Sequence, residues 1–294
     1  MDSTELDAHR KVVKTRSGQI SYLDFGAGRP VLLIHGLGTC NYLWRNLIGR
    51  LSGEYRLLAP DFPGHGASPV DPAQELTLTA FAEVIEDFLD ALGLPSVDLV
   101  SNDTGGAITQ IFAARHPERL RTLTLTNCEA HDNIPNEEFR GTVELARRGE
   151  LVAFAAQLTS NFAIARSPRS LGANYEDPAY LSDEMIATYL GSAAGTPEAA
   201  ANFQRLLAGL DAAELLAAEP GLRTLQVPTL IVWGTADLHF EVSWAHYLRG
   251  LIPGAYAVVE LPGAKLHFPD ERAAEFAEIL REHWSLHPPG ADDA

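Results

Sequence analysis

Short apolar runs separated by glycine- and proline-containing turns recur in the first 126 residues of the chain and again after residue 228. Such runs are typical of strands buried in a sheet, and alternation of apolar and polar residues is typical of a half-exposed hairpin. We therefore expect strands at 11–15, 19–25, 31–35, 55–59, 120–126, 229–233 and 256–261, with a further strand that runs from 97 into an acidic turn.

Apolar residues spaced by three and four positions predict helices between these strands, as at 41–51, 79–92, 242–251 and 271–284. Alternating strands and helices predict an α/β fold with a mostly parallel eight-stranded sheet. Residues 128–221 interrupt this alternation with helix-forming stretches and no strand pattern. We expect a core of 1–127 and 222–294 and an inserted helical cap of 128–221, with a frayed tail at 287–294.

One turn differs from its surroundings, because an acidic residue is followed at once by two glycines and an apolar helix. The segment 97–106 is a short apolar strand that ends in Ser-Asn-Asp-Thr-Gly-Gly. A strand, a tight turn and a helix in this order lift one side chain off the carboxyl edge of a sheet and aim a helix N-terminus at it. The lifted residue is Asp103, where the G-x-S-x-G pattern would place a serine.

Composition narrows the classes of protein that this chain can be. Its 39 acidic and 22 basic residues give a formal charge of −17, which disfavours nucleic acids and anionic membrane surfaces as partners. The two cysteines, Cys40 and Cys128, form no CxxC motif and no cluster with histidine, so we expect neither a disulfide framework nor a metal site. The chain contains no apolar run long enough to span a membrane, and we expect a cytoplasmic protein without a cofactor.

Three polar residues, Asp103, Asp237 and His267, follow three different predicted strands. In an open parallel sheet these strand ends line one crevice, so the three side chains can converge there. Together with His35-Gly36 and Asp61-x-x-Gly64-x-Gly66-x-Ser68, this order resembles the α/β-hydrolase fold. The resemblance implies a catalytic triad of Asp103, Asp237 and His267 and an oxyanion hole of the Leu37 and Thr104 N–H groups.

A carboxylate at the position of the nucleophile has a chemical consequence. Its attack on a saturated carbon gives an ester, which water can cleave, whereas a serine would give an ether. His267, oriented by Asp237, would then activate the water. In this respect the chain resembles epoxide hydrolases and haloalkane dehalogenases, and the stretch 42–46 (Tyr-Leu-Trp-Arg-Asn) resembles the dehalogenases in particular.

The residues that would assist the leaving atom in this chain differ from those usual in dehalogenases and in epoxide hydrolases. Dehalogenases usually hold the halide with a tryptophan directly after the nucleophile, where this chain has Thr104, and the cap contains no tryptophan. Epoxide hydrolases usually protonate the leaving oxygen with two cap tyrosines. We therefore expect epoxide opening of a small, largely apolar molecule, with cap residues as the candidate substrate-binding set: Tyr175, Tyr180, Tyr189, Phe203 and Gln204.

Other interpretations stay open at this stage. The chain resembles dehalogenases enough to keep haloalkanes as an alternative, and Asp103 could also serve an ester or lactone hydrolase. A ligand-binding protein on a hydrolase scaffold is a non-catalytic alternative. Glu129 and Asn127 follow the strand at 120–126, where some dehalogenases place their acid, and both are rivals of Asp237. His239 is a second, less favoured histidine for the base. The sequence predicts no oligomeric state.

Overall fold

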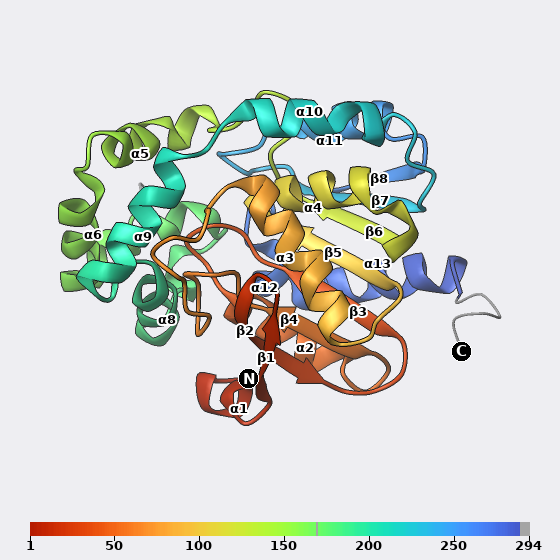
Figure 1. Cartoon of the computed structure of the whole chain (residues 1–294), viewed down its shortest axis with the longest axis horizontal. Coiled ribbons are helices and arrows are strands. Elements are labelled where there is room, and N and C mark those ends of the chain that lie inside the picture. Colours follow the sequence, from red (N-terminus) through yellow and green to blue (C-terminus); the bar gives the residue numbers. More distant parts are fainter. Residues whose placement is uncertain (169, 289–294) are drawn as a thin grey trace.

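The computed structural model describes residues 1–168 and 170–288 and is built around one eight-stranded sheet (Figure 1). The order of its strands is β1-β2-β4-β3-β5-β6-β7-β8; β2 is antiparallel to both neighbours, and the remaining pairs are parallel. The strands are β1 (Arg10–Thr15), β2 (Gly18–Phe25), β3 (Pro30–Ile34), β4 (Arg56–Pro60), β5 (Val97–Asn102), β6 (Leu120–Thr126), β7 (Thr229–Gly234) and β8 (Ala255–Leu261). The predicted α/β fold is confirmed.

Alternate side chains of the central strands supply two cores, one on each face of the sheet. In β3, Leu32 and Ile34 pack into one core, and Val31 and Leu33 pack into the other. The first core is covered by α3 (Leu78–Ala91), α4 (Thr104–Arg115), α10 (Ala212–Leu222) and α11 (Val242–Leu251). The second is covered by α1 (Ser3–Asp7), η1 (Asn41–Trp44), α2 (Arg45–Leu51), α12 (Phe268–Glu271) and α13 (Ala273–Leu286). The carboxyl ends of the parallel strands are left open by these layers.

Helices between β6 and β7 gather at this open end of the sheet (Figure 1). They are α5 (Glu137–Arg147), α6 (Leu151–Ser160), α7 (Phe162–Ala165), α8 (Asp183–Ala194) and α9 (Pro197–Ala208), with the short turns η3 (Leu171–Asn174) and η4 (Pro178–Tyr180). The helices α5, α6, α8 and α9 pack on one another, whereas α10 packs on α4. The last helix of the segment 128–221 therefore belongs to the layers that flank the sheet.

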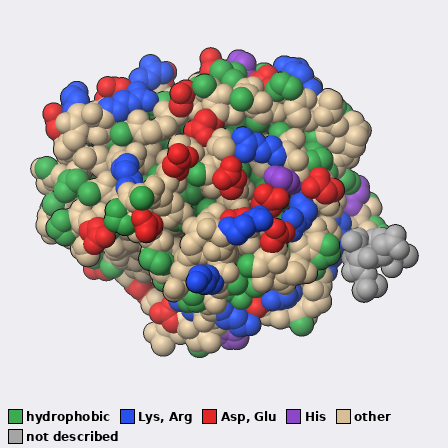
Figure 2. Space-filling model, viewed as in Figure 1, with side chains coloured by type: hydrophobic (Ala, Val, Ile, Leu, Met, Phe, Trp, Pro, Cys, Tyr) green, Lys and Arg blue, Asp and Glu red, His purple; other side chains and the backbone are tan. Residues whose placement is uncertain are grey.

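The surface carries charges of both signs, and Figure 2 shows acidic and basic side chains interspersed over one face of the molecule. Within residues 1–168 and 170–288, no helix combines the length and the apolar character needed to cross a bilayer. Of the tail expected to fray at 287–294, residues 289–294 lie outside the part of the chain that the structure describes.

Candidate active site

Asp103 occupies the turn between β5 and α4, with φ 58° and ψ −144°. A positive φ is uncommon for residues other than glycine and is found at functional turns. The two following glycines make the turn possible, because a Cβ at Gly105 would collide with the His35 carbonyl and one at Gly106 with Cys128. The sequence thus folds locally into the predicted strand, turn and helix.

Two backbone N–H groups hold the Asp103 carboxylate. One belongs to Thr104, the first residue of α4, and the other to Leu37, which follows β3. Gly36 lies directly against the same carboxyl group. The structure thus brings together Asp103 and the two residues that the sequence predicts for an oxyanion hole.

Three carboxyl groups crowd this edge of the sheet. Burial is the main cause that raises the pKa of each group. It raises the pKa of Glu129 to about 7 and that of Asp237 to about 6. The pKa of Asp103 lies well above its usual range, because the charges of Glu129 and Asp237 add to the effect of burial. The Thr104 hydroxyl donates to Glu129 Oε1 at 2.7 Å. Glu129 Oε2 is buried and has no hydrogen-bond partner among the described residues. Burial therefore favours the protonated form of each of the three groups.

Asp237 is held by groups other than the predicted base. Asn127 Nδ2 donates to its Oδ2 at 2.7 Å, and the His239 backbone N–H donates to its Oδ1 at 3.0 Å. Among the described residues, Asp237 makes no hydrogen bond to His267 and is not part of the cavity wall. The expected orientation of His267 by Asp237 therefore stays a prediction, with no hydrogen bond between the two side chains among the described residues. Asn127, a rival of Asp237 in the sequence analysis, donates to it and positions its carboxylate.

His267 lies in the cavity wall, is 1% exposed, and has no hydrogen-bond partner for either ring nitrogen within the described residues. Its ring packs edge-on against Tyr175, with centroids 5.1 Å apart, and lies 6.3 Å from the ring of Tyr189. Burial lowers the pKa of His267 to about 3, and the charges of His239 and Arg45 act in the same direction. The ring is therefore neutral at ordinary pH and can accept a proton.

Four of the five expected substrate-binding residues are absent from the described cavity wall: Tyr175, Tyr180, Tyr189 and Gln204. The Tyr175 and Tyr189 hydroxyls are 3.4 Å apart beside the buried ion pair of Arg45 and Asp270, in which Arg45 Nη1 and Asp270 Oδ2 are 2.7 Å apart. Asn46 donates to the Tyr180 hydroxyl, and Gln204 Oε1 accepts the Leu151 N–H. The three tyrosines thus lie between cap and core, and Gln204 bonds within the cap; of the five residues, Phe203 lines the described cavity.

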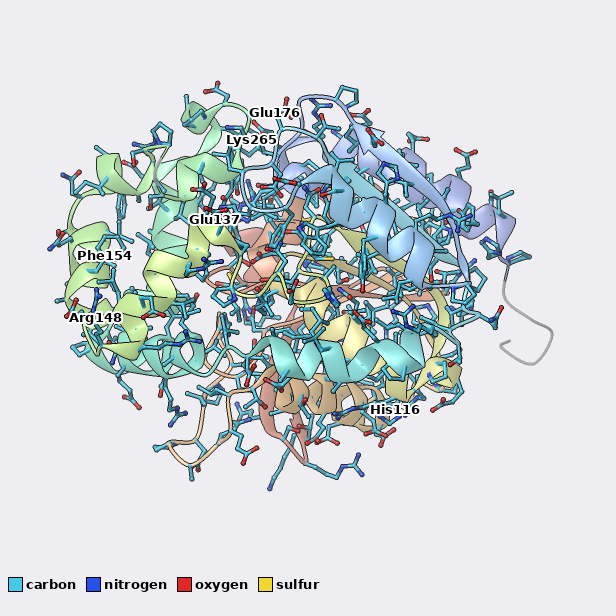
Figure 3. The ribbon with its side chains drawn as sticks, turned by 90° about the horizontal axis from the view of Figure 1, so that it is seen from above. His116, Glu137, Arg148, Phe154, Glu176 and Lys265 are labelled. Carbon is cyan, nitrogen blue, oxygen red and sulfur yellow. The ribbon has the colours of Figure 1, made fainter. Side chains whose placement is uncertain are left out.

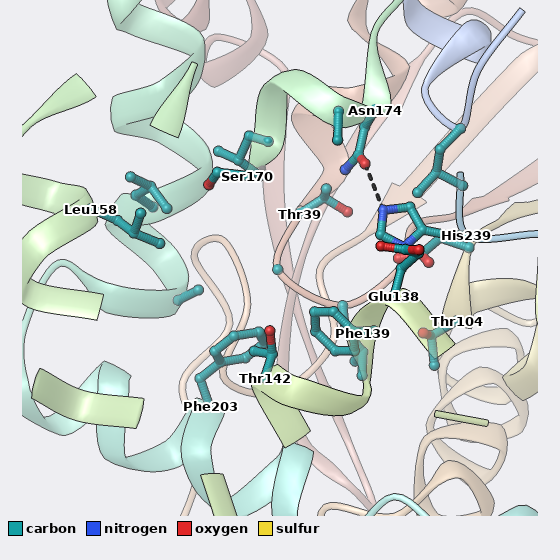
Figure 4. Close-up of a pocket in the computed structure, with 18 of the residues that line it drawn as sticks. Thr39, Thr104, Glu138, Phe139, Thr142, Leu158, Ser170, Asn174, Phe203 and His239 are labelled. Carbon is teal, nitrogen blue, oxygen red and sulfur yellow. Dashed lines mark hydrogen bonds between the residues drawn. The ribbon is translucent and has the colours of Figure 1, made fainter. Parts of the chain in front are cut away.

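The cavity has a volume of about 260 Å³, with polar groups at its floor and mainly apolar cap side chains around it. Asp103, Glu129, His239 and His267 lie at the sheet edge. Figure 4 shows Phe139, Leu158 and Phe203 around the same space, with the His239 ring 3.0 Å from Asn174 Oδ1. The outer wall includes Phe154, which is 36% exposed and lies at the edge of the cap in Figure 3. The arrangement suits a small, largely apolar molecule.

The wall also contains Glu129, expected from the sequence only as a rival of Asp237, and His239, expected only as a less favoured base. Each follows a strand of the parallel sheet at its carboxyl end by a few residues, and this position makes both candidates.

We expect the Gly36→Ala variant to fold and to lose about 10²-fold in kcat/KM, because the new methyl group would displace the Asp103 carboxyl group that Gly36 contacts. Steady-state kinetics and thermal unfolding together test this expectation. Gly53→Ala is the matched control, since a Cβ there meets nothing within 4 Å. Equal activity of both variants would contradict the close packing of Gly36 on Asp103.

Comparisons with known proteins agree with this fold. A sequence model described as "alpha/beta hydrolase fold" matches residues 29–271. The chain is similar to haloalkane dehalogenase 2 of Mycobacterium tuberculosis, with 31% identity over 270 residues that cover 88% of each chain. It is also similar to a cis-3-alkyl-4-alkyloxetan-2-one decarboxylase of Shewanella oneidensis, with 26% identity covering 84% of this chain and 81% of the relative. An epoxide hydrolase structure, CorEH, shares the fold with a TM-score of 0.76 and 18% identity, covering 94% and 98% of the two chains.

Proposed function

Because the chain belongs to the alpha/beta hydrolase fold family and is a hydrolase, we propose that it opens small, largely apolar epoxides through a covalent ester on Asp103. The observation that carries the proposal is the placement of the Asp103 carboxylate. It stands on a strained turn at the floor of an apolar cavity, between the N–H groups of Leu37 and Thr104.

In the first step, one Asp103 oxygen attacks a ring carbon of the epoxide. The carbon–oxygen bond breaks with its electron pair on oxygen, and that oxygen takes up a proton to become a hydroxyl group. The product is a hydroxyalkyl ester of Asp103. The apolar walls exclude water from this step and hold the substrate over the carboxylate.

In the second step, His267 accepts a proton from a water molecule whose oxygen attacks the carbonyl carbon of the ester. The negative charge that forms on the carbonyl oxygen is stabilised by the N–H groups of Leu37 and Thr104. Collapse breaks the bond between Asp103 Cγ and the alkyl oxygen, which receives the proton from His267. A diol leaves, and Asp103 keeps one oxygen from water. Packing against Tyr175 and Tyr189, rather than a carboxylate, orients the His267 ring in this scheme.

Single turnover of 1,2-epoxyhexane in heavy-oxygen water tests the proposal. The label should be found in the peptide that contains Asp103, because water attacks the carbonyl carbon of that residue. The diol of the first turnover should be unlabelled in its new hydroxyl, which comes from Asp103. Label in the diol with none in Asp103 would show direct attack of water and overturn the covalent mechanism.

A haloalkane is the second candidate substrate, favoured by the 31% identity to haloalkane dehalogenase 2. Against it, the described cavity wall contains no tryptophan, and Trp44, Trp233 and Trp284 are buried elsewhere. A leaving halide would also meet the carboxyl group of Glu129. Release of bromide from 1-bromohexane at a rate above that of epoxide opening would favour this candidate.

A further inference from the structure

Opening an epoxide requires a proton donor near the leaving oxygen, and the described cavity wall contains no tyrosine that could serve. The cavity does contain a buried carboxyl group, that of Glu129, which has no role in the two steps described above. Glu129 follows β6 and is 4% exposed. Its Oε1 accepts the Thr104 hydroxyl at 2.7 Å, whereas its buried Oε2 has no hydrogen-bond partner among the described residues. A buried polar atom without a partner in a ligand cavity indicates a contact that a ligand completes.

We propose that Glu129 is the general acid that protonates the oxygen released when Asp103 is alkylated. This inference rests on the proposed function of Asp103. It assigns to the cavity a class of substrates with an oxygen leaving group, namely epoxides and other strained cyclic ethers.

The contacts of the two carboxyl groups indicate which of them carries the proton. Asp103 accepts two backbone N–H groups, from Leu37 and Thr104, and these favour its ionised form. Glu129 accepts the Thr104 hydroxyl group and its own backbone N–H, and the charge of Asp237 acts on it. Burial raises the pKa of Glu129 to about 7. Burial raises the pKa of both groups, so the assignment rests on their contacts: Asp103, held by two backbone N–H groups, is the nucleophile, and Glu129, whose Oε2 has no partner among the described residues, is the acid.

Protons balance over the full cycle. Glu129 gives its proton to the alkoxide in the first step and becomes a carboxylate. Hydrolysis of the ester in the second step yields Asp103 as a carboxylic acid, which returns a proton to Glu129. The cycle consumes one epoxide and one water molecule and yields one diol, with no electron transfer.

The same contacts argue against a halide as the natural leaving group. Thr104 directly follows the nucleophile, and its hydroxyl hydrogen is already donated to Glu129. A halide requires N–H or O–H donors and no proton transfer, whereas an alkoxide requires a proton. The Glu129 carboxyl group beside Asp103 is therefore suited to an oxygen leaving group.

Alkylation of Asp103 by 1,2-epoxyhexane, followed in a single turnover of the full-length protein, tests the assignment. Glu129→Gln should slow alkylation by about 10²–10⁴-fold, because an amide cannot give up a proton. In the wild type the alkylation rate should fall as the pH rises through about 7, where Glu129 ionises. This alkaline decrease should be absent in Glu129→Gln. Asp103, Asp237, Glu138, His239 and His267 also border the site and remain unchanged in that variant.

Two further variants keep the test decisive. Glu137→Gln, a solvent-exposed neighbour outside the described cavity wall, should alkylate like the wild type. Thr104→Val removes the hydroxyl that orients Glu129 and should slow alkylation while keeping the alkaline decrease, which covers the case that Glu129→Gln does not fold. Alkylation of folded Glu129→Gln within threefold of wild type, with an unchanged pH profile, would overturn the assignment. Absence of any ester on Asp103 in the wild type would instead overturn the proposed function.

Discussion

Asp103→Asn is expected to lower turnover of 1,2-epoxyhexane by at least about 10³-fold, because an amide oxygen is a poor nucleophile. The same variant should be more stable than the wild type at about pH 8, by about 1–3 kcal/mol. The amide preserves the shape of the side chain, tolerates the positive φ of this position, and removes a charge that burial, Glu129 and Asp237 disfavour. Product analysis and urea unfolding measure the two effects.

The pH dependence of this stability difference has a definite sign. The pKa of Asp103 is raised in the folded protein, so between the unfolded and folded values the native state binds more protons than the unfolded chain. The free energy of unfolding of the wild type therefore falls as pH rises through this window. The advantage of Asp103→Asn should shrink on acidification. If the stability difference in favour of Asp103→Asn instead grew as the pH was lowered, the Asp103 carboxylate would be stabilising the fold.

His267→Gln is expected to stop the reaction after the first step. The ester on Asp103 should accumulate to one equivalent, visible as a mass increase of the intact protein by the mass of the epoxide. The reason is that the His267 ring packs on Tyr175 and Tyr189 with both nitrogens unpartnered among the described residues, whereas the ring of the nearby His239 is bonded to Asn174. Loss of the base should slow hydrolysis of the ester by about 10²–10⁴-fold.

His239 provides the decisive comparison, since it is the other histidine of the cavity wall. In His239→Gln the ester should be hydrolysed and turnover should continue, because the His239 ring is engaged with Asn174. His246→Gln, an exposed substitution of the same kind outside the described wall, controls for the general effect of losing a histidine. Accumulation of the ester in His239→Gln, with normal turnover in His267→Gln, would transfer the role of base to His239.

The parts of this molecule that follow local rules could be predicted from the sequence. The turn at Asp103 combines an acidic residue, two glycines and a helix start within six residues, and this local pattern is enough to predict it. The eight strands were likewise found from their apolar runs. In both cases the signal lies in neighbouring residues, so no knowledge of distant contacts is needed.

The cap could not be predicted in this way, because the direction of a helical side chain depends on packing. Successive residues on a helix point about 100° apart. In α9, Phe203 lines the cavity and Gln204 does not; in α8, Leu190 lines it and Tyr189 does not. The sequence shows which cap residues carry hydroxyl and amide groups, but it does not show in which direction these side chains point. The same limit applies to His267 and Asp237, whose partners come from segments far away in the chain.

Asn127 joins parts of the site that belong to different strands. Its carbonyl accepts the Asp103 N–H at 2.9 Å, while its side chain binds Asp237 and exchanges hydrogen bonds with Gly234. The Asp103 turn and the Asp237 loop are thereby fixed to the sheet by a residue that is itself fully buried, and no cap residue takes part in these bonds. Substitutions in α5, α6, α8 and α9 can therefore reshape the cavity and change which molecules fit, while the reacting carboxylate keeps its place. New substrate specificities can therefore arise, by evolution or by design, through substitutions in the cap alone.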